Sequence, residues 1–548
     1  MSLKEKCILL LIAIAVIVIL ACIPDNPKSK LALEHASPVK WKEIVHDESL
    51  LHSFKWLGIS SFSGAKKDNF IINYINKNFK VELEPIFLDW NGFQKRRPLM
   101  LAGGDIPDVM WDGDPLGVRR NINNGFIMEV PYEVILKEAP TYVKQLNRFG
   151  KQAWLYSHHK GKNFGLPTFH SDPGTPRIGA WNMEYLRRVG ITKVPDTLKE
   201  MEEALRRFRY NDPDQNGKKD TYGWYPDISH WSLSYIEVFC HYNLLPFEFC
   251  EKEGDITWGG IEPEAKKALE VLYRWYKDDL LDPDHILGAS HGGQGRSKFV
   301  NGKTGYSYPV DGYSNYDSSL KGTLAHDTKL LINCEIAPSA PIKNIRGKRV
   351  GRTWGGAAHI LQLGKHLEND PQKVLRFLHM MESIASNEEH YLRVSTGREG
   401  VDWKIGEDGY EVIGKAKEDA NFRKKQMLSN GGPYSNIFFF PSSLNIRTVE
   451  LKSKKKIIFD EKYTKSEWSI RNPIGKSDVV PSASRYLEDL RRFQTISYVN
   501  FITGITPLDQ FDDFVKEWHE RGGKVIIKEA REIYKQLQDI YQRVGAEL

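Results

Sequence analysis

The spacing of apolar and polar positions changes several times along the chain, and these changes predict alternating strands and helices. FKWLGISSF, from residue 54, reads as a strand, and KKDNFIINYINKNFK follows with a helical period. One face of that helix carries Phe70, Ile71, Tyr74, Ile75 and Phe79. VELEPIFL and DVMW are further strands. Because strand–helix–strand units place their strands in parallel, this part of the chain predicts an α/β fold with helices around a parallel sheet.

The rest of the chain is more helical. PDTLKEMEEALRRF begins with Thr197 and Glu200, which have the spacing of a capping box. EPEAKKALEVLYRWYKDDLL is amphipathic, and three more helices are expected over 482–494, 507–521 and 524–545. With 548 residues and 41% hydrophobic content, the chain is long enough to form two domains or lobes.

The N-terminal segment has the pattern of an export signal. MSLKEK precedes a charge-free run from Cys7 to Ile23 that contains ILAC, which resembles a bacterial lipobox. We expect 1–21 to be a lipoprotein signal peptide, Cys22 to be lipidated and 22–40 to be a tether. The alternative is an uncleaved anchor helix, although the run is short for a span that needs about 20 residues. Both interpretations place the remaining chain outside the cytoplasmic membrane.

Charge and cysteine content exclude some classes of function. A net charge of +6 over 548 residues is too weak to indicate nucleic-acid binding. The sequence contains no CxxC pair and no Cys/His array of the kind that binds zinc. Cys240 and Cys250 could form a disulfide in an exported protein, or they could be two buried thiols.

The loop NDPDQNGKKDTYGW (211–224) has oxygen-bearing groups at alternate positions. Positions 1, 3, 5, 7 and 9 of a calcium-binding loop are filled by Asp212, Asp214, Asn216, the Lys218 carbonyl and Asp220. Gly217 stands at position 6, where such loops turn. Position 12, which carries a bidentate Glu in calcium sensors, is Gly223 here. We therefore expect a structural Ca²⁺ site rather than a sensor, with a plain polar turn as the alternative.

Six motifs in order indicate a family. They are LMLAGGDIPDVMW (99–111), NMEYLRRVGITKVPDTLKEMEEALRRF (182–208), DPDQNGKKDTYGW (212–224), FVNGKTGY (299–306), GREGVDW (397–403) and FITGITPLDQFDDFVKEWHERGG (501–523). Together with the lipobox they resemble extracellular solute-binding lipoproteins of family 1, the carbohydrate-binding proteins of ABC transporters. More narrowly, the chain resembles the long members related to binders of oligosaccharides and alginate fragments.

The resemblance implies a type II periplasmic-binding-protein fold, in which two α/β lobes joined by hinge segments close over a ligand. By analogy one lobe comprises 41–170 and 335–395, and the other comprises 171–334 and 396–548. The resemblance also implies a monomer, held by its lipid anchor at the extracellular face of the membrane, that delivers an oligosaccharide to the permease subunits of an importer. Related calcium loops use the residue after position 9, which implies a contribution from Thr221.

A sugar-binding site needs flat aromatic rings and polar groups that meet hydroxyls. GREGVDW offers Arg398, Glu399 and Trp403 in a glycine-flanked loop, with Trp403 as the first-choice platform. Its alternative role is a buried ring that pins the loop. Further candidates in loops and at strand ends are Trp354, Tyr308, Tyr313, Asp89, Trp90, Arg177, Trp181 and Trp231. Because Arg pairs bidentately with carboxylates, Arg177 and Arg398 suit a uronate, although neutral sugars also use Arg.

Two other functions compete with a transport receptor. A secreted glycoside hydrolase would need two carboxylates across the scissile bond; Glu399 and Asp402 are candidates for such a pair, but their spacing along a loop does not establish that role. The chain has no GxSxG, HExxH or P-loop motif, and we expect no enzymatic activity. A cell-surface glycan adhesin is the other alternative, since sequence does not separate retention of a polysaccharide from its transport.

Overall fold

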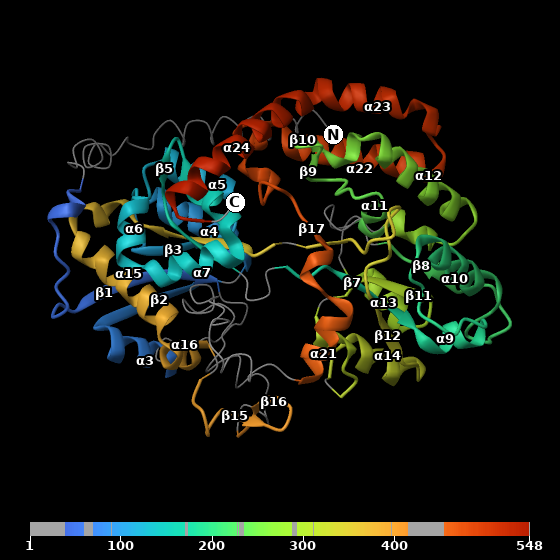
Figure 1. The fold of residues 1–548 in the computed structure, drawn as a ribbon, viewed down its shortest axis with the longest axis horizontal. Coiled ribbons are helices and arrows are strands. Elements are labelled where there is room, and N and C mark those ends of the chain that lie inside the picture. The colour runs from blue at the N-terminus through green and yellow to red at the C-terminus, as the bar shows by residue number, and fades with distance from the viewer. Residues whose placement is uncertain are drawn as a thin grey trace, which may run out of the picture.

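The computed structural model shows two lobes, each built around its own β-sheet (Figure 1). It describes residues 39–59, 70–88, 90–169, 174–226, 228, 235–287, 293–310, 312–319, 321–353, 355–395, 397–414 and 454–546. The expected signal peptide, Cys22 and almost all of the tether lie outside these ranges. Within them, no helix has the length and apolar character needed to cross a bilayer.

The first lobe contains a five-stranded sheet of order β2-β1-β3-β14-β6. The strands are β1 (His52–Ile59), β2 (Val81–Leu88), β3 (Val109–Asp112), β6 (Leu166–Phe169) and β14 (Ala357–Leu363). β1 pairs in parallel with β2 and β3, as the strand–helix–strand pattern predicts. β14 is antiparallel to both β3 and β6, so the sheet is mixed.

Helices cover the first sheet. They include α3 (Phe70–Phe79), α4 (Trp90–Ala102), α5 (Pro115–Asn123), α7 (Pro140–Gly150) and α15 (Pro371–Ser386). All of those named here except α4 carry an apolar face with helical periodicity. α3 buries Ile71, Ile75 and Phe79 of the predicted face, together with Ile72. Burial of this stripe, rather than helix propensity alone, stabilises so short a helix.

The second lobe contains a four-stranded sheet of order β12-β7-β11-β8. Its strands are β7 (Ile178–Asn182), β8 (Tyr222–Trp224), β11 (Thr304–Val310) and β12 (Ile336–Ser339). The surrounding helices include α10 (Leu198–Tyr210), α11 (Ile236–His241), α12 (Pro263–Lys277) and α22 (Ala483–Thr503). The capping box of Thr197 and Glu200 is present at the start of α10, as predicted.

Three segments of the chain run between the lobes side by side (Figure 1). They are the lead into β7, the lead into β14 through β13 (Gly351–Arg352), and the segment around β17 (Ser469–Ile470). β13 pairs in parallel with β17, and the Arg177 N–H donates to the Arg352 carbonyl at 2.8 Å. These hydrogen bonds join the crossing segments into one hinge.

Two features differ from the lobe boundaries expected from the sequence. β12 starts at Ile336 and belongs to the second sheet, although the residues from 335 onward were expected in the first lobe. The C-terminal helix α24 (Lys524–Arg543) contacts both lobes. Its Arg531 donates to the Ile256 carbonyl of the second lobe, whereas Arg543 donates to the Gly161 carbonyl of the first. The C-terminus therefore spans the lobes instead of belonging to one.

Candidate functional site

The GREGVDW loop closes on itself instead of presenting a sugar platform. Trp403 is only 1% exposed, and its indole N–H donates to the Gly397 carbonyl at 3.3 Å. Arg398 holds buried Asp402 through two side-chain hydrogen bonds, of 2.8 and 3.1 Å. Glu399 is exposed beside this pair. The structure contradicts the prediction of Trp403 as a platform and agrees with the alternative, a buried ring that pins the loop.

Trp181 is also part of a core. It is fully buried in β7, with its ring centroid 4.3 Å from that of Tyr306 and 6.0 Å from that of Phe208. A ring with no exposed surface cannot stack on a sugar, so its predicted binding role is wrong. β7 is buried at all five positions, which explains why an aromatic residue there packs inward.

Four other predicted residues are not placed by the structure. Asp89, Trp231 and Trp354 lie outside the described residues. Trp90 begins α4, but its side chain is not described. Their predicted roles stay predictions.

Arg177 and Tyr308 are the predicted residues that the fold brings together. Arg177 lies half-buried on the hinge segment before β7, and Tyr308 lies on β11, which pairs with β7. Burial lowers the pKa of the Arg177 guanidinium, and Tyr308 acts in the opposite direction. Burial raises the pKa of the Tyr308 phenol well above 10. At neutral pH Arg177 therefore offers a cationic fork next to the hinge, and the neutral Tyr308 side chain, only 6% exposed, packs in the core beside it.

A buried ion pair supports this position from the neighbouring hinge segment. Arg352 of β13 is 1% exposed and donates to the Glu248 carboxylate, which is also buried. The carbonyl of the same Arg352 accepts the Arg177 N–H. Buried charges require a partner, so Arg352 and Glu248 must stay together. The pair fixes the backbone that holds Arg177.

Glu237 is a buried acid that the sequence analysis did not identify. It lies on α11 at 3% exposure, and the Tyr306 hydroxyl donates to its carboxylate. Burial raises the pKa of Glu237 to about 7, and the Tyr306 hydrogen bond opposes that shift. Gly179 permits this contact, because an added Cβ would overlap the Tyr306 hydroxyl. The sequence feature that could have identified Glu237 is the presence of an acid within the otherwise apolar run IEVFC.

Tyr313 lies farther along the same chain segment, in the short helix η6 (Tyr313–Tyr316). It is half-buried, and its ring packs against Phe459 with centroids 5.4 Å apart. Asn315 fixes this segment to α14 (Leu324–Ile332), since its side-chain oxygen accepts the Leu324 N–H at 3.3 Å. Tyr313 is available at the surface of the second lobe, but none of the described contacts link it to Arg177.

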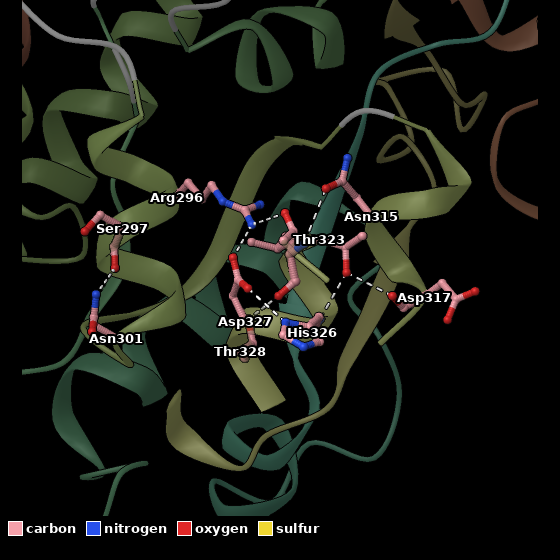
Figure 2. Close-up of polar contacts among 11 residues, drawn as sticks. Arg296, Ser297, Asn301, Asn315, Asp317, Thr323, His326, Asp327 and Thr328 are labelled. Atoms are coloured by element: carbon pink, nitrogen blue, oxygen red, sulfur yellow. Dashed lines mark hydrogen bonds and ion pairs between the residues drawn. The ribbon is translucent and has the colours of Figure 1, made fainter. Parts of the chain in front are cut away.

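A polar network behind η6 joins α14 to α13 (Gln294–Val300), as Figure 2 shows. Arg296 pairs with Asp327 at 2.7 Å, and His326 contacts the other oxygen of Asp327 at 3.0 Å. The Thr323 hydroxyl donates to the Asp317 carbonyl. These contacts are satisfied within the lobe, so they indicate a structural role.

The acidic loop connects α10 to β8, as expected. Asp212 accepts the N–H groups of Asn216 and Gly217, which closes the turn. The Asn216 amide donates to both Asp214 and Asp220, at 2.7 and 2.9 Å. Across the described residues, no three His, Cys, Asp or Glu side chains are gathered around a metal position.

Two observations in this loop nevertheless fit a cation. One oxygen of Asp214 and the Thr221 hydroxyl are buried without a hydrogen-bond partner. Burial raises the pKa of Asp214, and the neighbouring acids Asp212 and Asp220 raise it further. The donor set, with carboxylates, an amide oxygen, a hydroxyl and the Lys218 carbonyl, consists of the hard oxygens that Ca²⁺ prefers. The residues therefore fit Ca²⁺ in chemistry.

Cys240 and Cys250 do not form a disulfide in this structure. Cys240, Cys250 and Cys334 are free and buried. Burial raises the pKa of the Cys250 thiol to about 12, so it is unreactive at neutral pH.

Proteins similar to this chain have been characterised as binding proteins and lipoproteins. No model of a known protein family matches the chain. Polygalacturonan/rhamnogalacturonan-binding protein YtcQ of Bacillus subtilis is 22% identical over 488 residues, which cover 88% of this chain and 91% of YtcQ. Lipoprotein LipO of the same organism is 21% identical over 474 residues, or 84% of this chain and 87% of LipO.

Solved structures share the fold at lower identity. An HMO-binding solute-binding protein associated with an ABC transporter of Bifidobacterium longum infantis has a TM-score of 0.64 at 16% identity, with 90% of this chain and 99% of that chain covered. The S. pneumoniae ABC-transporter substrate-binding protein FusA, in complex with kestose, has a TM-score of 0.61 at 14% identity and coverages of 89% and 99%. Alginate-binding protein AlgQ2 has a TM-score of 0.60 at 14% identity and coverages of 89% and 98%. The chain is therefore a homologue of YtcQ and LipO along most of its length, and it has the two-lobe, type II fold of ABC-transporter solute-binding proteins.

Proposed function

We propose that the chain is an extracellular receptor that captures a uronate-bearing oligosaccharide between its lobes and delivers it to an ABC importer. The observation that carries this proposal is the position of Arg177 and Tyr308 beside the hinge. A half-buried guanidinium binds a carboxylate in two-pronged geometry and more strongly than it would in water. Tyr308 is buried next to Arg177 and supports this position from β11.

Similarity to YtcQ supports an acidic ligand. That relative is named for binding polygalacturonan and rhamnogalacturonan, whose galacturonate units carry carboxylates. The similarity to LipO and the lipobox at Cys22 support a lipid anchor at the extracellular face of the membrane. The two lobes of a single chain can both contact one sugar, so binding needs no second copy of the chain, which supports a monomer.

We propose binding without catalysis. Arg398 pairs with Asp402, so this acid, one of the pair considered for a hydrolase, is buried in an ion pair. YtcQ and the structural neighbours from B. longum infantis and S. pneumoniae are named as binding proteins. Incubation with galacturonate oligomers should leave their chain length unchanged. Shortening of the oligomers would favour the hydrolase.

A structural Ca²⁺ in the acidic loop is part of the proposal. Asp212, Asp214, Asn216, Lys218 and Asp220 would hold it, with Thr221 next to them. Bound Ca²⁺ would neutralise the crowded carboxylates and fix the turn between α10 and β8. Solved proteins of this fold include AlgQ2 without calcium ion and an EF-hand mutant of FusA, which supports a loop of this kind here.

A thermal-shift screen tests the proposed ligand class. A ligand at about 100 times its dissociation constant stabilises the folded state by roughly 2.7 kcal/mol. We expect galacturonate oligomers to raise the melting temperature, and neutral glucose oligomers of equal length to have less effect. A melting temperature raised by peptides but by no sugar would refute the proposal.

A further inference from the structure

A pocket of about 560 Å³ lies at the second-lobe end of the hinge. One wall is the hairpin 343–349, here called the basic hairpin, and the opposite wall is Glu467 and Trp468. The basic hairpin runs into β13, and Trp468 directly precedes β17. Since β13 and β17 pair with each other, the pocket is continuous with two of the three segments that cross between the lobes.

The basic hairpin is held in a fixed shape by one buried side chain. The Asn344 side-chain oxygen accepts the N–H groups of Arg346 and Lys348, each at 2.9 Å. Its amide nitrogen donates to Asn243 at 2.7 Å. Gly347 supplies the left-handed backbone of the turn, with φ of +74°. The two cations at the tip are therefore presented by a preformed turn.

The pocket has more cations than the surrounding acids neutralise. Lys343 and Arg349 both pair with Asp196 at the base of the hairpin. Arg346 and Lys348 are exposed at its tip, and no ion pair engages either of them in the part of the chain that the structure describes. Glu467 is the one acid among the lining residues.

Trp468 draws further positive charge to the opposite wall. The Arg349 guanidinium lies 5.4 Å from the centroid of its ring, and the Lys465 ammonium lies 5.6 Å from it. Such contacts orient a cation without neutralising it, but Arg349 is already paired with Asp196, so Lys465 is the one that adds positive charge. The pocket thus combines a concave shape, two cations at the hairpin tip that no described ion pair engages, and an indole with Lys465 held against its ring.

We propose that this pocket is a second site for an acidic glycan, which binds the carboxylates of a uronate chain beyond the unit held at Arg177. The proposal rests on the proposed function, because it takes the same class of ligand. A concave site on a rigid turn suits a discrete chain of sugars better than a flat membrane surface. Phosphate groups of a wall polymer share the anionic chemistry, and the test below separates the two sources.

The test compares short and long ligands in the full mature chain. Binding of a galacturonate dimer, a galacturonate decamer and inorganic polyphosphate is measured by calorimetry at low salt and at 0.5 M salt. The test variant is Arg346→Gln/Lys348→Gln. The control variant is Lys528→Gln/Lys535→Gln, which removes two exposed cations of α24.

We expect the double variant at the basic hairpin to bind the decamer about threefold to tenfold more weakly than wild type, and to bind the dimer unchanged. The control variant should bind both ligands as wild type does. The difference should shrink at high salt, because exposed charges are screened.

Three results would overturn the inference. A decamer affinity equal to that of wild type would show that the basic hairpin does not touch the ligand. A loss of polyphosphate binding alone would assign the pocket to phosphate polymers. If neither galacturonate ligand binds wild type, the proposed function itself fails, and that outcome is distinct because the dimer reports on it independently of the hairpin.

Discussion

At the residue scale, burial separates side chains that look equivalent in the sequence. Arg177 and Arg398 both stand in glycine-containing segments a few residues before a tryptophan. Arg398 is occupied by Asp402 four residues away, whereas Arg177 lies at the hinge near Tyr308. Contacts between distant segments decide these roles, so residue type and spacing could nominate the candidates but not rank them.

Trp403 gives a direct test of this assignment. Trp403→Ala should lower the free energy of unfolding by about 3–5 kcal/mol, because a buried ring leaves a cavity. Chemical denaturation measures this change. Trp41→Ala, at a half-buried position, is a control that should cost less. Lost sugar affinity with unchanged stability would instead return Trp403 to the binding site.

Glu237 predicts a pH dependence of stability. Its pKa is about 7 in the folded chain against a usual 4.5, so the folded state retains a proton that the unfolded state has lost between these values. Stability should therefore fall as pH rises from 4.5 to 7, by roughly 3 kcal/mol in total from this group.

Denaturation of Glu237→Gln across this pH range measures the effect. The variant should lose that part of the pH dependence and should be more stable than wild type at pH 8. Glu203→Gln, which removes a half-exposed acid of the same lobe, should leave the slope unchanged. Parallel stability curves for wild type and Glu237→Gln would contradict the account.

At the element scale, local periodicity predicted helices better than it predicted sheet partners. The buried face of α3 and the capping box of α10 follow from residues close together in sequence. The antiparallel placement of β14 and the position of β12 in the second sheet depend on pairings with strands more than 150 residues away. Sequence periodicity contains no information about such partners, which is why the expected boundary at 335 differs from the structure.

The loop between α10 and β8 is the element where metal removal is informative. We expect Ca²⁺ to raise the melting temperature of the chelator-treated protein, because it relieves repulsion among Asp212, Asp214 and Asp220. Asp214→Asn/Asp220→Asn should abolish that increase, and exposed Asp509→Asn should not. An equal Ca²⁺ effect in the Asp214/Asp220 variant would place the metal elsewhere.

At the scale of the whole molecule, the two lobes are joined by more than their hinge. Among the described residues, three segments that hydrogen-bond to one another cross between them, and α24 adds contacts from Arg531 to the second lobe and from Arg543 to the first. A change in the relative position of the lobes would involve both the crossing segments, where Arg177 and Arg352 lie, and the contacts of α24. In the proposed function, a ligand held at Arg177 would lie against these crossing segments, so its capture would be coupled to the relative position of the lobes.

The most direct test of the account is calorimetric comparison of a galacturonate oligomer with its methyl ester, which keeps the sugar shape and removes the charge. The account predicts that wild type binds the acid about tenfold or more tightly than the ester, since hydrogen bonds to charged groups contribute about 1.5–3 kcal/mol. Arg177→Gln should lose most of this preference. Equal affinity of wild type for the acid and the ester would contradict the central claim that this chain recognises a uronate carboxylate.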